Sequence, residues 1–236
     1  MEDTRIRLAD FRSAVFFIGA GMSAESGVPT YRGRGGIWAQ YDYGEYACQR
    51  AFDRDPQKVL DFHELRRQTV LGCAPHAGHH ALAALQAAHP QLHVVTQNID
   101  GLLQRAGVRV AAELHGSLWR VRCARHGVRE DLAAATYATR ACPDCGAPLR
   151  PDITWFEDPV DEDVFARAGE RIAQCELFVA VGTSAVVYPA ASFIPLAQRH
   201  GATMVEINPQ ATEASPLFMR TLREPASAAL SQRFSA

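Results

Sequence analysis

Short apolar runs, each followed by small or polar residues, recur along the chain. They span residues 14–18, 92–96 and 177–181, and a further segment of the same kind follows at 205–209. Apolar runs of about four to eight residues that end at turn residues are typical of strands buried in a parallel sheet. The pattern therefore predicts an α/β fold.

Two segments between these runs have helical patterns. Asp55 is placed to cap a helix whose first residue is Pro56, and a second helix is predicted over 75–88. His63 and Arg66 are three residues apart and so are neighbours on the first helix, where a solvated face is the simplest interpretation. The apolar residues of that helix are predicted to share one side: Val59, Leu60, Phe62 and Leu65.

A glycine-rich stretch follows the first strand. Gly19, Gly21 and Ala24 fit the pattern G-x-G-x-x-G/A, in which the backbone approaches a pyrophosphate at a strand–helix turn. Small residues at such a turn are also often packing devices. The pattern by itself therefore leaves a dinucleotide site and a purely structural turn both open.

The residues after this turn distinguish it from a hydride-transfer site. The segment 26–29 contains Gly and Pro, which end the helix almost at once, and 30–36 is a loop with an aromatic ring and a guanidinium group. Asp42 lies about 20 residues on, where a ribose-binding carboxylate is expected, but its surroundings lack strand character. We expect a dinucleotide site without standard hydride-transfer chemistry.

Similar polar or small residues follow each predicted strand. Because parallel strands end at one edge of a sheet, these residues are expected to converge on one ligand. Asn98 or Asp100 can instead serve as a local helix cap. The convergent residues are Gly19, Ala20, Gly21, Gln97, Asn98, Gly182, Thr183, Ser184 and Asn208.

Bulk composition limits the remaining possibilities. The net charge of −2 gives no reason to expect a nucleic-acid partner, and no apolar run is long enough to cross a membrane. The N-terminus lacks the apolar core of a signal peptide, so a cytoplasmic location is expected. In a reducing compartment, six cysteines favour a metal or free thiols over disulfides.

Two short hooks carry metal-ligand spacing. Cys123-x-x-His126 and Cys142-x-x-Cys145 are separated by 15 residues, which predicts a tetrahedral structural zinc site. The alternative is that zinc is lost or held loosely.

His115 is a further candidate. It precedes a glycine beyond a short strand, and a histidine there is either a structural residue or a proton-transfer group. The residue pattern alone does not choose between them.

Taken together, these segments resemble the sirtuins, the NAD-dependent protein-lysine deacylases. The resemblance runs from Gly19 to about Asn208 in the family's order. It is carried by GAGMSAESGVPTYRG, TQNIDGL, LHGSL, the paired hooks, VGTSAVVYP and INP.

The resemblance implies a Rossmann-like large domain and a small zinc-binding lobe with a helical insertion, and NAD and an acyl-lysine protein or peptide would enter the cleft between them. The large domain would comprise 1–44, 73–118 and 153–236, and the small lobe 45–72 and 119–152. NAD would be consumed, zinc would be structural, and a monomer is expected. The products would be free lysine, nicotinamide and O-acyl-ADP-ribose.

Residue roles also follow from the resemblance. His115 would be the general base, and Asn98 and Asp100 would belong to the catalytic set. The zinc ligands would be Cys123, His126, Cys142 and Cys145. NAD would be held by Gly19, Ala20, Gly21, Glu25, Tyr31, Arg32, Gln97, Asn98, Asp100, Gly182, Thr183, Ser184, Asn208 and Ala226.

Several positions bear on the acyl group. Thr30 stands where many sirtuins have Asp, and in this it is similar to the branch of the family that removes acidic acyl groups. His63 and Arg66 stand where that branch has a Tyr-x-x-Arg pair. Arg66 would bind a succinyl or malonyl carboxylate, with Ala47 leaving room; simple deacetylation is the alternative. Glu157 replaces a usual Gly, which would either favour basic peptides or hinder docking.

Two other functions fit the same scaffold. A mono-ADP-ribosyltransferase would modify protein acceptors without needing an acyl-lysine. A non-catalytic NAD-binding module would have no need of His115 or of the polar run at 97–100.

Overall fold

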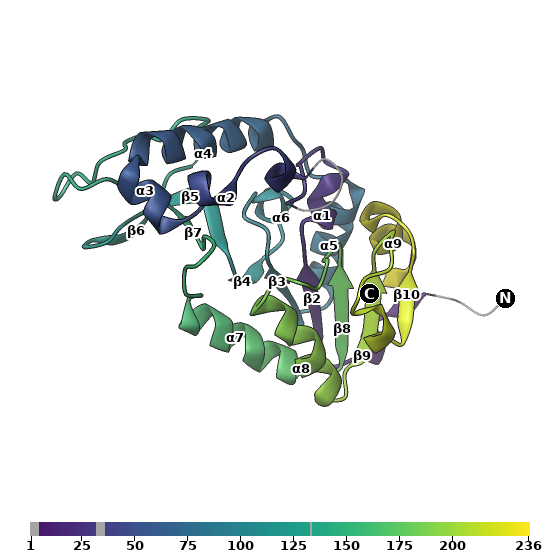
Figure 1. Cartoon of the computed structure of the whole chain (residues 1–236). Helices are drawn as coiled ribbons and strands as arrows, with labels where there is room; N and C mark the ends of the chain where they lie inside the picture. Colours follow the sequence, from purple (N-terminus) through teal and green to yellow (C-terminus); the bar gives the residue numbers. More distant parts are fainter. Residues whose placement is uncertain (1–4, 32–35, 133) are drawn as a thin grey trace.

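The computed structural model describes residues 5–31, 36–132 and 134–236. Within these ranges six strands form a parallel sheet in the order β10-β9-β8-β2-β3-β4 (Figure 1). This confirms the predicted α/β class. The strands are β2 (Ala14–Ile18), β3 (Leu92–Thr96), β4 (Val110–Glu113), β8 (Leu177–Val181), β9 (Thr203–Ile207) and β10 (Arg220–Leu222).

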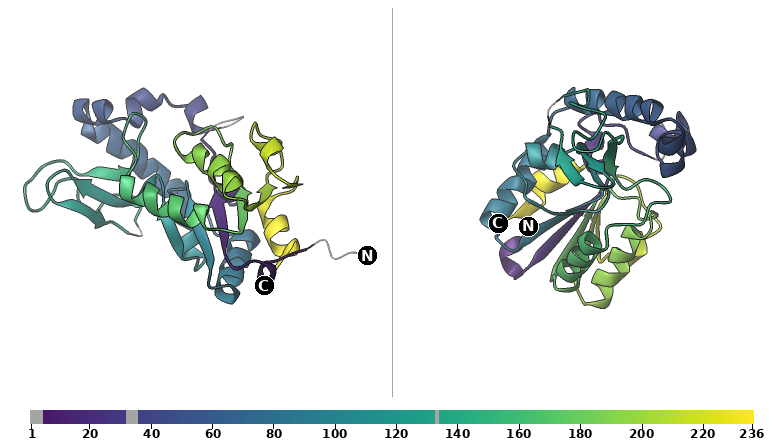
Figure 2. Two further views of the ribbon diagram at one scale, coloured as in Figure 1. Left: turned by 90° about the horizontal axis from the view of Figure 1, so that it is seen from below. Right: turned by 90° about the vertical axis from the view of Figure 1, so that its left-hand side faces the viewer.

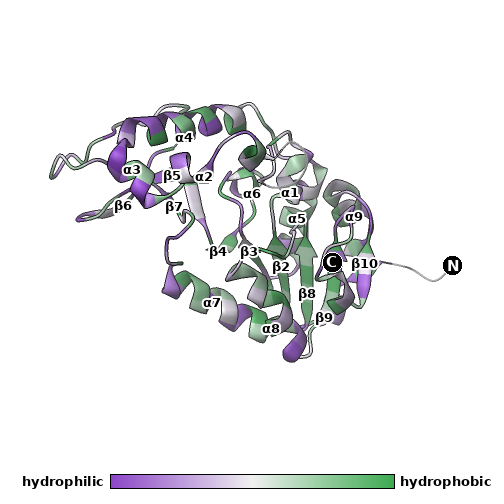
Figure 3. Cartoon of the chain, viewed as in Figure 1, coloured by the Kyte–Doolittle hydropathy of each residue, from purple (hydrophilic) through white to green (hydrophobic). Residues whose placement is uncertain are grey.

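Helices cover both faces of this sheet (Figure 2). Phe16 and Ile18 of β2 pack with α5 (Ala77–Ala88) and α9 (Ala226–Gln232). Successive side chains of a strand point to opposite faces, so Val15 and Phe17 pack instead with α7 (Glu162–Ala173) and α8 (Phe193–Arg199). Figure 3 shows β2 and β8 in the green of apolar residues, as expected for strands buried on both faces.

A second part of the molecule combines a small antiparallel sheet with a helical segment. The sheet has the order β6-β5-β7, and β5 and β7 share one apolar core with α3 and α4. β5 and β7 cross the predicted domain boundaries at 118/119 and 152/153, which stay a prediction. The elements are α2 (Tyr43–Tyr46), α3 (Gln49–Arg54), α4 (Pro56–Leu71), β5 (Gly116–Cys123), β6 (Gly127–Glu130) and β7 (Arg150–Ile153).

The remaining elements are short. As predicted, the helix after the glycine turn ends early, at Ala24. That helix is α1 (Gly21–Ala24). Other short elements are α6 (Leu102–Arg105), β1 (Ile6–Arg7) and β11 (Phe234–Ser235), the last two paired with each other. No helix within the described ranges has both the length and the apolar character needed to cross a bilayer.

Helix α4 begins as predicted and buries three of its four predicted apolar residues, Val59, Leu60 and Phe62. The Asp55 carboxylate accepts a hydrogen bond from the Lys58 N–H, which confirms the cap. His63 is only 1% exposed, so a solvated face was the wrong interpretation, whereas Leu65 is 48% exposed rather than packed. The buried stripe runs through Leu60, His63 and Arg67 at helical spacing, and Leu65 lies outside it.

Arg67 lies in the core, although no sequence pattern indicates a role for it. Its guanidinium is fully buried and donates to the Asp131 carboxylate at 2.8 Å and to the backbone oxygens of Asp131 and Ala134. It also lies over the rings of Trp119 and Tyr137. Burying a charge is costly unless it is paired and hydrogen-bonded, so these contacts explain how α4 carries an arginine into the core.

Candidate active site and metal centre

A cavity of about 680 Å³ opens at the C-terminal ends of β2, β3, β8 and β9. This is the edge at which open α/β sheets bind ligands. Of the predicted convergent residues, the cavity is lined by Gly19, Ala20, Gly21, Gln97, Asn98, Gly182, Thr183, Ser184 and Asn208.

The glycines at this edge allow two turns to touch. A Cβ added to Gly19 would lie 2.7 Å from the Gly182 oxygen, and one added to Gly21 would lie 2.7 Å from the Gly182 Cα. Gly182 itself has a φ of +60°, which favours glycine. The glycines therefore serve turn-to-turn packing and, because both turns border the cavity, also leave room beside it.

Amide side chains join the strand ends. Gln97 Nε2 donates to Thr183 Oγ1 at 3.1 Å, and Asn208 Nδ2 donates to the Thr183 carbonyl at 3.0 Å. Asn98 Nδ2 donates to the Gly19 carbonyl at 3.0 Å. The Asn98 Oδ1 atom is buried without a partner in the described chain, so the site holds an acceptor that fits a ligand N–H such as that of a carboxamide.

Three of the described residues that were predicted to bind NAD, Asp100, Glu25 and Ala226, are absent from the cavity lining. The Asp100 carboxylate accepts the Leu102 N–H at 2.8 Å, and burial raises its pKa. Glu25 accepts hydrogen bonds from the N–H and hydroxyl of Ser227, beside the buried Ala226, so both residues belong to the contact between α1 and α9. Arg32 lies outside the described residues.

His115 borders the cavity with one ring nitrogen already engaged. Its Nδ1 lies 3.0 Å from the Gln97 carbonyl oxygen. A carbonyl can only accept, so Nδ1 carries the proton of the neutral ring and Nε2 is left as a base. Burial lowers the pKa of His115, with the Gln97 carbonyl opposing this in part. The ring is therefore neutral at pH 7 and able to take a proton.

A second group of side chains lies at the α4 side of the cavity. Arg66 donates to the Tyr31 hydroxyl at 2.7 Å and lies over its ring. His63 Nε2 accepts the Trp155 indole N–H at 3.2 Å, which leaves the proton of the neutral ring on Nδ1. Burial, and then the charge of Arg66, lower the pKa of His63 well below its usual range. His63 therefore brings no positive charge to the cavity, whereas Arg66 does.

Glu157 lies at the wall of the cavity in a left-handed conformation. Its φ is +73°, and its carboxylate is 3.1 Å from Arg50, with both side chains mostly exposed. Such a conformation costs a non-glycine residue about 1 kcal/mol, more than an exposed ion pair usually returns.

We expect Glu157→Gly to raise the melting temperature by at most about 2–4 °C, because glycine adopts this φ without strain while loss of the Arg50 ion pair offsets part of the gain. Calorimetry of the purified variant would measure it. Glu157→Ala is the matched control, since it removes the carboxylate but keeps the strained backbone. Equal shifts in both variants would show that strain is not the cause.

The predicted metal ligands meet at one point. The ligand atoms of Cys123, His126, Cys142 and Cys145 all lie within 4.8 Å of one another. The Cys123 Sγ is 3.6 Å from the Cys145 Sγ and 3.6 Å from His126 Nδ1. Bond lengths of about 2.3 Å to sulfur and about 2.0 Å to nitrogen give tetrahedral edges of about 3.5–3.8 Å, so the four residues fit zinc.

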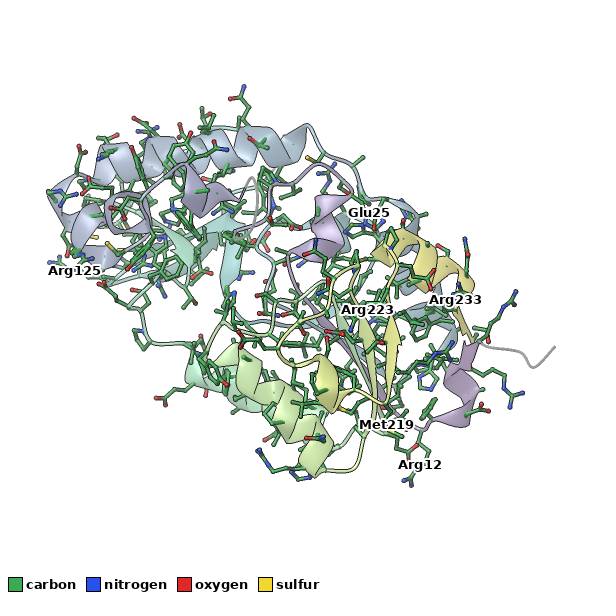
Figure 4. The ribbon with its side chains drawn as sticks, turned by 45° about the vertical axis from the view of Figure 1, so that its right-hand side comes forward. Arg12, Glu25, Arg125, Met219, Arg223 and Arg233 are labelled. Atoms are coloured by element: carbon green, nitrogen blue, oxygen red, sulfur yellow. The ribbon has the colours of Figure 1, made fainter. Side chains whose placement is uncertain are left out.

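A backbone N–H group favours the thiolate form of one of these cysteines. The Arg125 N–H points to the Cys123 Sγ at 3.4 Å and is the largest cause lowering the pKa of that thiol to about 6 (Arg125 is labelled in Figure 4). A thiolate is the form that binds metal. With three sulfurs and one nitrogen, the ligand set is closed, as in structural rather than catalytic zinc sites.

The comparisons with known proteins agree with this geometry. The model of the Sir2 family matches residues 19–189. An NAD-dependent protein deacylase 2 from Pyrobaculum aerophilum is 43% identical over 211 residues, covering 89% of this chain and 85% of that protein.

Solved structures are similar across both parts of the molecule. A Sir2 homolog–NAD complex is 37% identical with a TM-score of 0.86, covering 94% of this chain and 88% of that one. A Sir2–p53 peptide–NAD⁺ structure is 27% identical with a TM-score of 0.81, covering 95% and 92%. The chain belongs to the Sir2 family, the sirtuins.

Proposed function

We propose that this protein is an NAD-dependent protein-lysine deacylase that releases free lysine, nicotinamide and O-acyl-ADP-ribose. The observation that carries the proposal is the state of His115. The ring lines the cavity, its Nδ1 proton is directed to the Gln97 carbonyl, and its Nε2 has the lone pair of a base. The family membership and the deacylase relatives support the same reaction.

NAD supplies an electrophilic ribose carbon once nicotinamide leaves. The residues of the cavity have the task of binding and orienting it, which is where much of an enzyme's rate enhancement originates. Asn98 Oδ1 would accept an N–H of the cofactor, and Tyr31 would cover the ribose from the α4 side. The turns at Gly19 and Gly182 would hold the remainder.

His115 would remove a proton from a ribose hydroxyl. Asp100 would act indirectly, because its carboxylate is used on the Leu102 N–H and its backbone carbonyl on the Trp119 indole. Glu25 and Ala226 would likewise support the cavity through the contact between α1 and α9.

The substrate would be an acyl-lysine within a protein or peptide. A similar Sir2 structure holds a p53 peptide together with NAD⁺. The test is mass spectrometry of acetyl-, succinyl- and malonyl-lysine peptides incubated with NAD. Nicotinamide release with mass gained by an unmodified acceptor would point instead to ADP-ribosyl transfer, and no turnover at all would contradict the proposal.

For the acyl group we propose a preference for acidic chains. Among the described residues that line the cavity, Arg66 is the one Arg or Lys, and Thr30, Tyr31 and Ala47 belong to the same lining. A guanidinium can bind a carboxylate through two parallel hydrogen bonds. The Tyr31 hydroxyl is its present partner and would be exchanged or shared.

Arg66→Met is expected to lower kcat/KM for succinyl- and malonyl-lysine peptides by about 10- to 100-fold, the usual effect of losing a charged hydrogen bond. The value for acetyl-lysine should change by less than about threefold. Arg105→Met is a suitable control, because Arg105 donates to the Val70 and Cys73 carbonyls outside the cavity lining. If succinyl and acetyl rates fell in the same ratio, carboxylate recognition by Arg66 would be wrong.

A further inference from the structure

We infer that Glu206 is a positioning residue that holds the loop at 208–215 against the NAD cavity; this inference rests on the proposed function. Glu206 lies on β9 and is 2% exposed, although its strand neighbours Val205 and Ile207 are apolar core residues. A carboxylate at such a place loses its hydration, so its partners decide what it does there.

Both carboxylate oxygens are occupied by this loop and its surroundings. Thr212 Oγ1 donates to Oε1 at 2.7 Å, and Ser215 Oγ donates to Oε2 at 2.7 Å. The Arg223 guanidinium lies 2.6 Å from Oε2. Thr212 and Ser215 come from the loop itself, and Arg223 directly follows β10.

Arg223 extends the network to the beginning of the loop. Its guanidinium donates to the backbone oxygens of Asn208 and Gln210, each at 3.2 Å, and to Ser215 Oγ at 2.9 Å. The Ser215 Oγ in turn accepts the Thr212 N–H at 2.8 Å. One buried carboxylate and one guanidinium therefore fix both ends of a single loop.

This loop forms a wall of the cavity, whereas the Glu206 carboxylate that holds it does not. Asn208, Gln210 and Thr212 line the cavity, but Glu206 and Ser215 are absent from its lining. An apolar side chain would fill position 206 without the cost of burying a charge. The carboxylate instead restricts the loop to a single conformation. The side chains that would face NAD are thereby held in one position.

The test separates NAD binding from the chemical step. Glu206→Gln places an amide N–H₂ against the donors that now face a carboxylate, so the loop should lose its fixed position. We expect KM for NAD to rise about tenfold, with kcat at saturating NAD and KM for the acyl peptide within about twofold; tenfold corresponds to the loss of about one charged hydrogen bond. Ser215→Ala should raise KM for NAD by about threefold in the same way.

Glu224→Gln is the matched control. Glu224 follows Arg223 in the chain, but its carboxylate pairs with Arg233 beside α9, outside the cavity lining (Arg223 and Arg233 are labelled in Figure 4). Its KM for NAD should match that of the wild type. Calorimetric titration with NAD gives the dissociation constant directly, so the inference can be tested even if no acyl peptide is turned over.

The outcomes are distinct. A higher dissociation constant for NAD in Glu206→Gln and Ser215→Ala, with unchanged Glu224→Gln, supports the inference. If Glu206→Gln does not fold, Ser215→Ala decides alone. Unchanged NAD binding in the folded variants, or a fall in kcat with equal changes in both KM values, would overturn it. A wild type that binds NAD but deacylates nothing would contradict the proposed function alone.

Discussion

Replacement of His115 by alanine is expected to lower kcat for deacylation by about 10²–10⁴-fold, the usual contribution of a positioned general base. The variant removes the free Nε2 but leaves the Gln97 carbonyl and the strand ends in place. NAD should therefore still bind, with a dissociation constant close to that of the wild type. Single-turnover mass spectrometry with an acyl-lysine peptide measures the first quantity, and calorimetric titration measures the second.

The pH dependence of kcat/KM is an independent test of the role of His115. Burial lowers the pKa of His115 because it disfavours the imidazolium ion. The base is active when neutral, so activity is lost as the pH falls through this lowered pKa. We expect the acid limb of kcat/KM to lie below pH 6.5, the ordinary value for histidine.

His200→Ala is the control for this prediction, because His200 lies at the end of α8, away from the cavity lining. It should retain wild-type rates. Substantial deacylation by His115→Ala, or an acid limb centred well above pH 6.5 in the wild type, would contradict the assignment of His115 as the base.

Elements with strong local signals were predictable from the sequence. The strands at 14–18, 92–96 and 177–181 are found with the predicted bounds, because continuous apolar runs fit a sheet covered on both faces. The Asp55 cap also depends on neighbouring residues alone. The convergence of strand ends followed from the parallel sheet, and the structure places those ends in one cavity.

The environment of α4 was not predictable in this way. Whether His63 meets solvent or the Trp155 indole depends on a partner 92 residues away, which no periodicity in the helix reveals. The same holds for Arg67, whose partner Asp131 is 64 residues distant. Both residues are polar, so a pattern that assigns polar positions to the surface places them on the wrong side of the helix.

The partners of Glu206 were not predictable from the sequence either. Its polar character within an apolar strand was visible in the sequence, but its partners Thr212, Ser215 and Arg223 have no fixed spacing that marks them. The metal centre differs, because two short hooks have a spacing that only a shared ion explains well. Local chemistry can therefore be predicted when the partners lie within one turn or one motif.

Loss of the metal is expected to unfold the part of the molecule that contains β5–β7. Cys142→Ala removes one of the four ligands whose atoms lie within 4.8 Å of one another. Structural zinc supplies about 10–16 kcal/mol in small domains, as much as the whole stability of a typical fold. Cys123 and Cys142 are themselves members of the core that includes Leu118, Ile153 and Trp155, so its packing should fail with the site.

Deacylase activity should fall when this core loses its packing, because Ile153 and Trp155 also line the cavity. Elemental analysis should find one zinc ion per chain in the wild type and much less in Cys142→Ala, and amide hydrogen exchange should show β5–β7 opening before the parallel sheet. Cys73→Ala is the control: this buried thiol donates to the Thr69 carbonyl, lies outside the cluster, and should leave the zinc content unchanged. A folded wild type without zinc, or a Cys142→Ala variant with full zinc content, would show that these four residues are not the ligands of a structural ion.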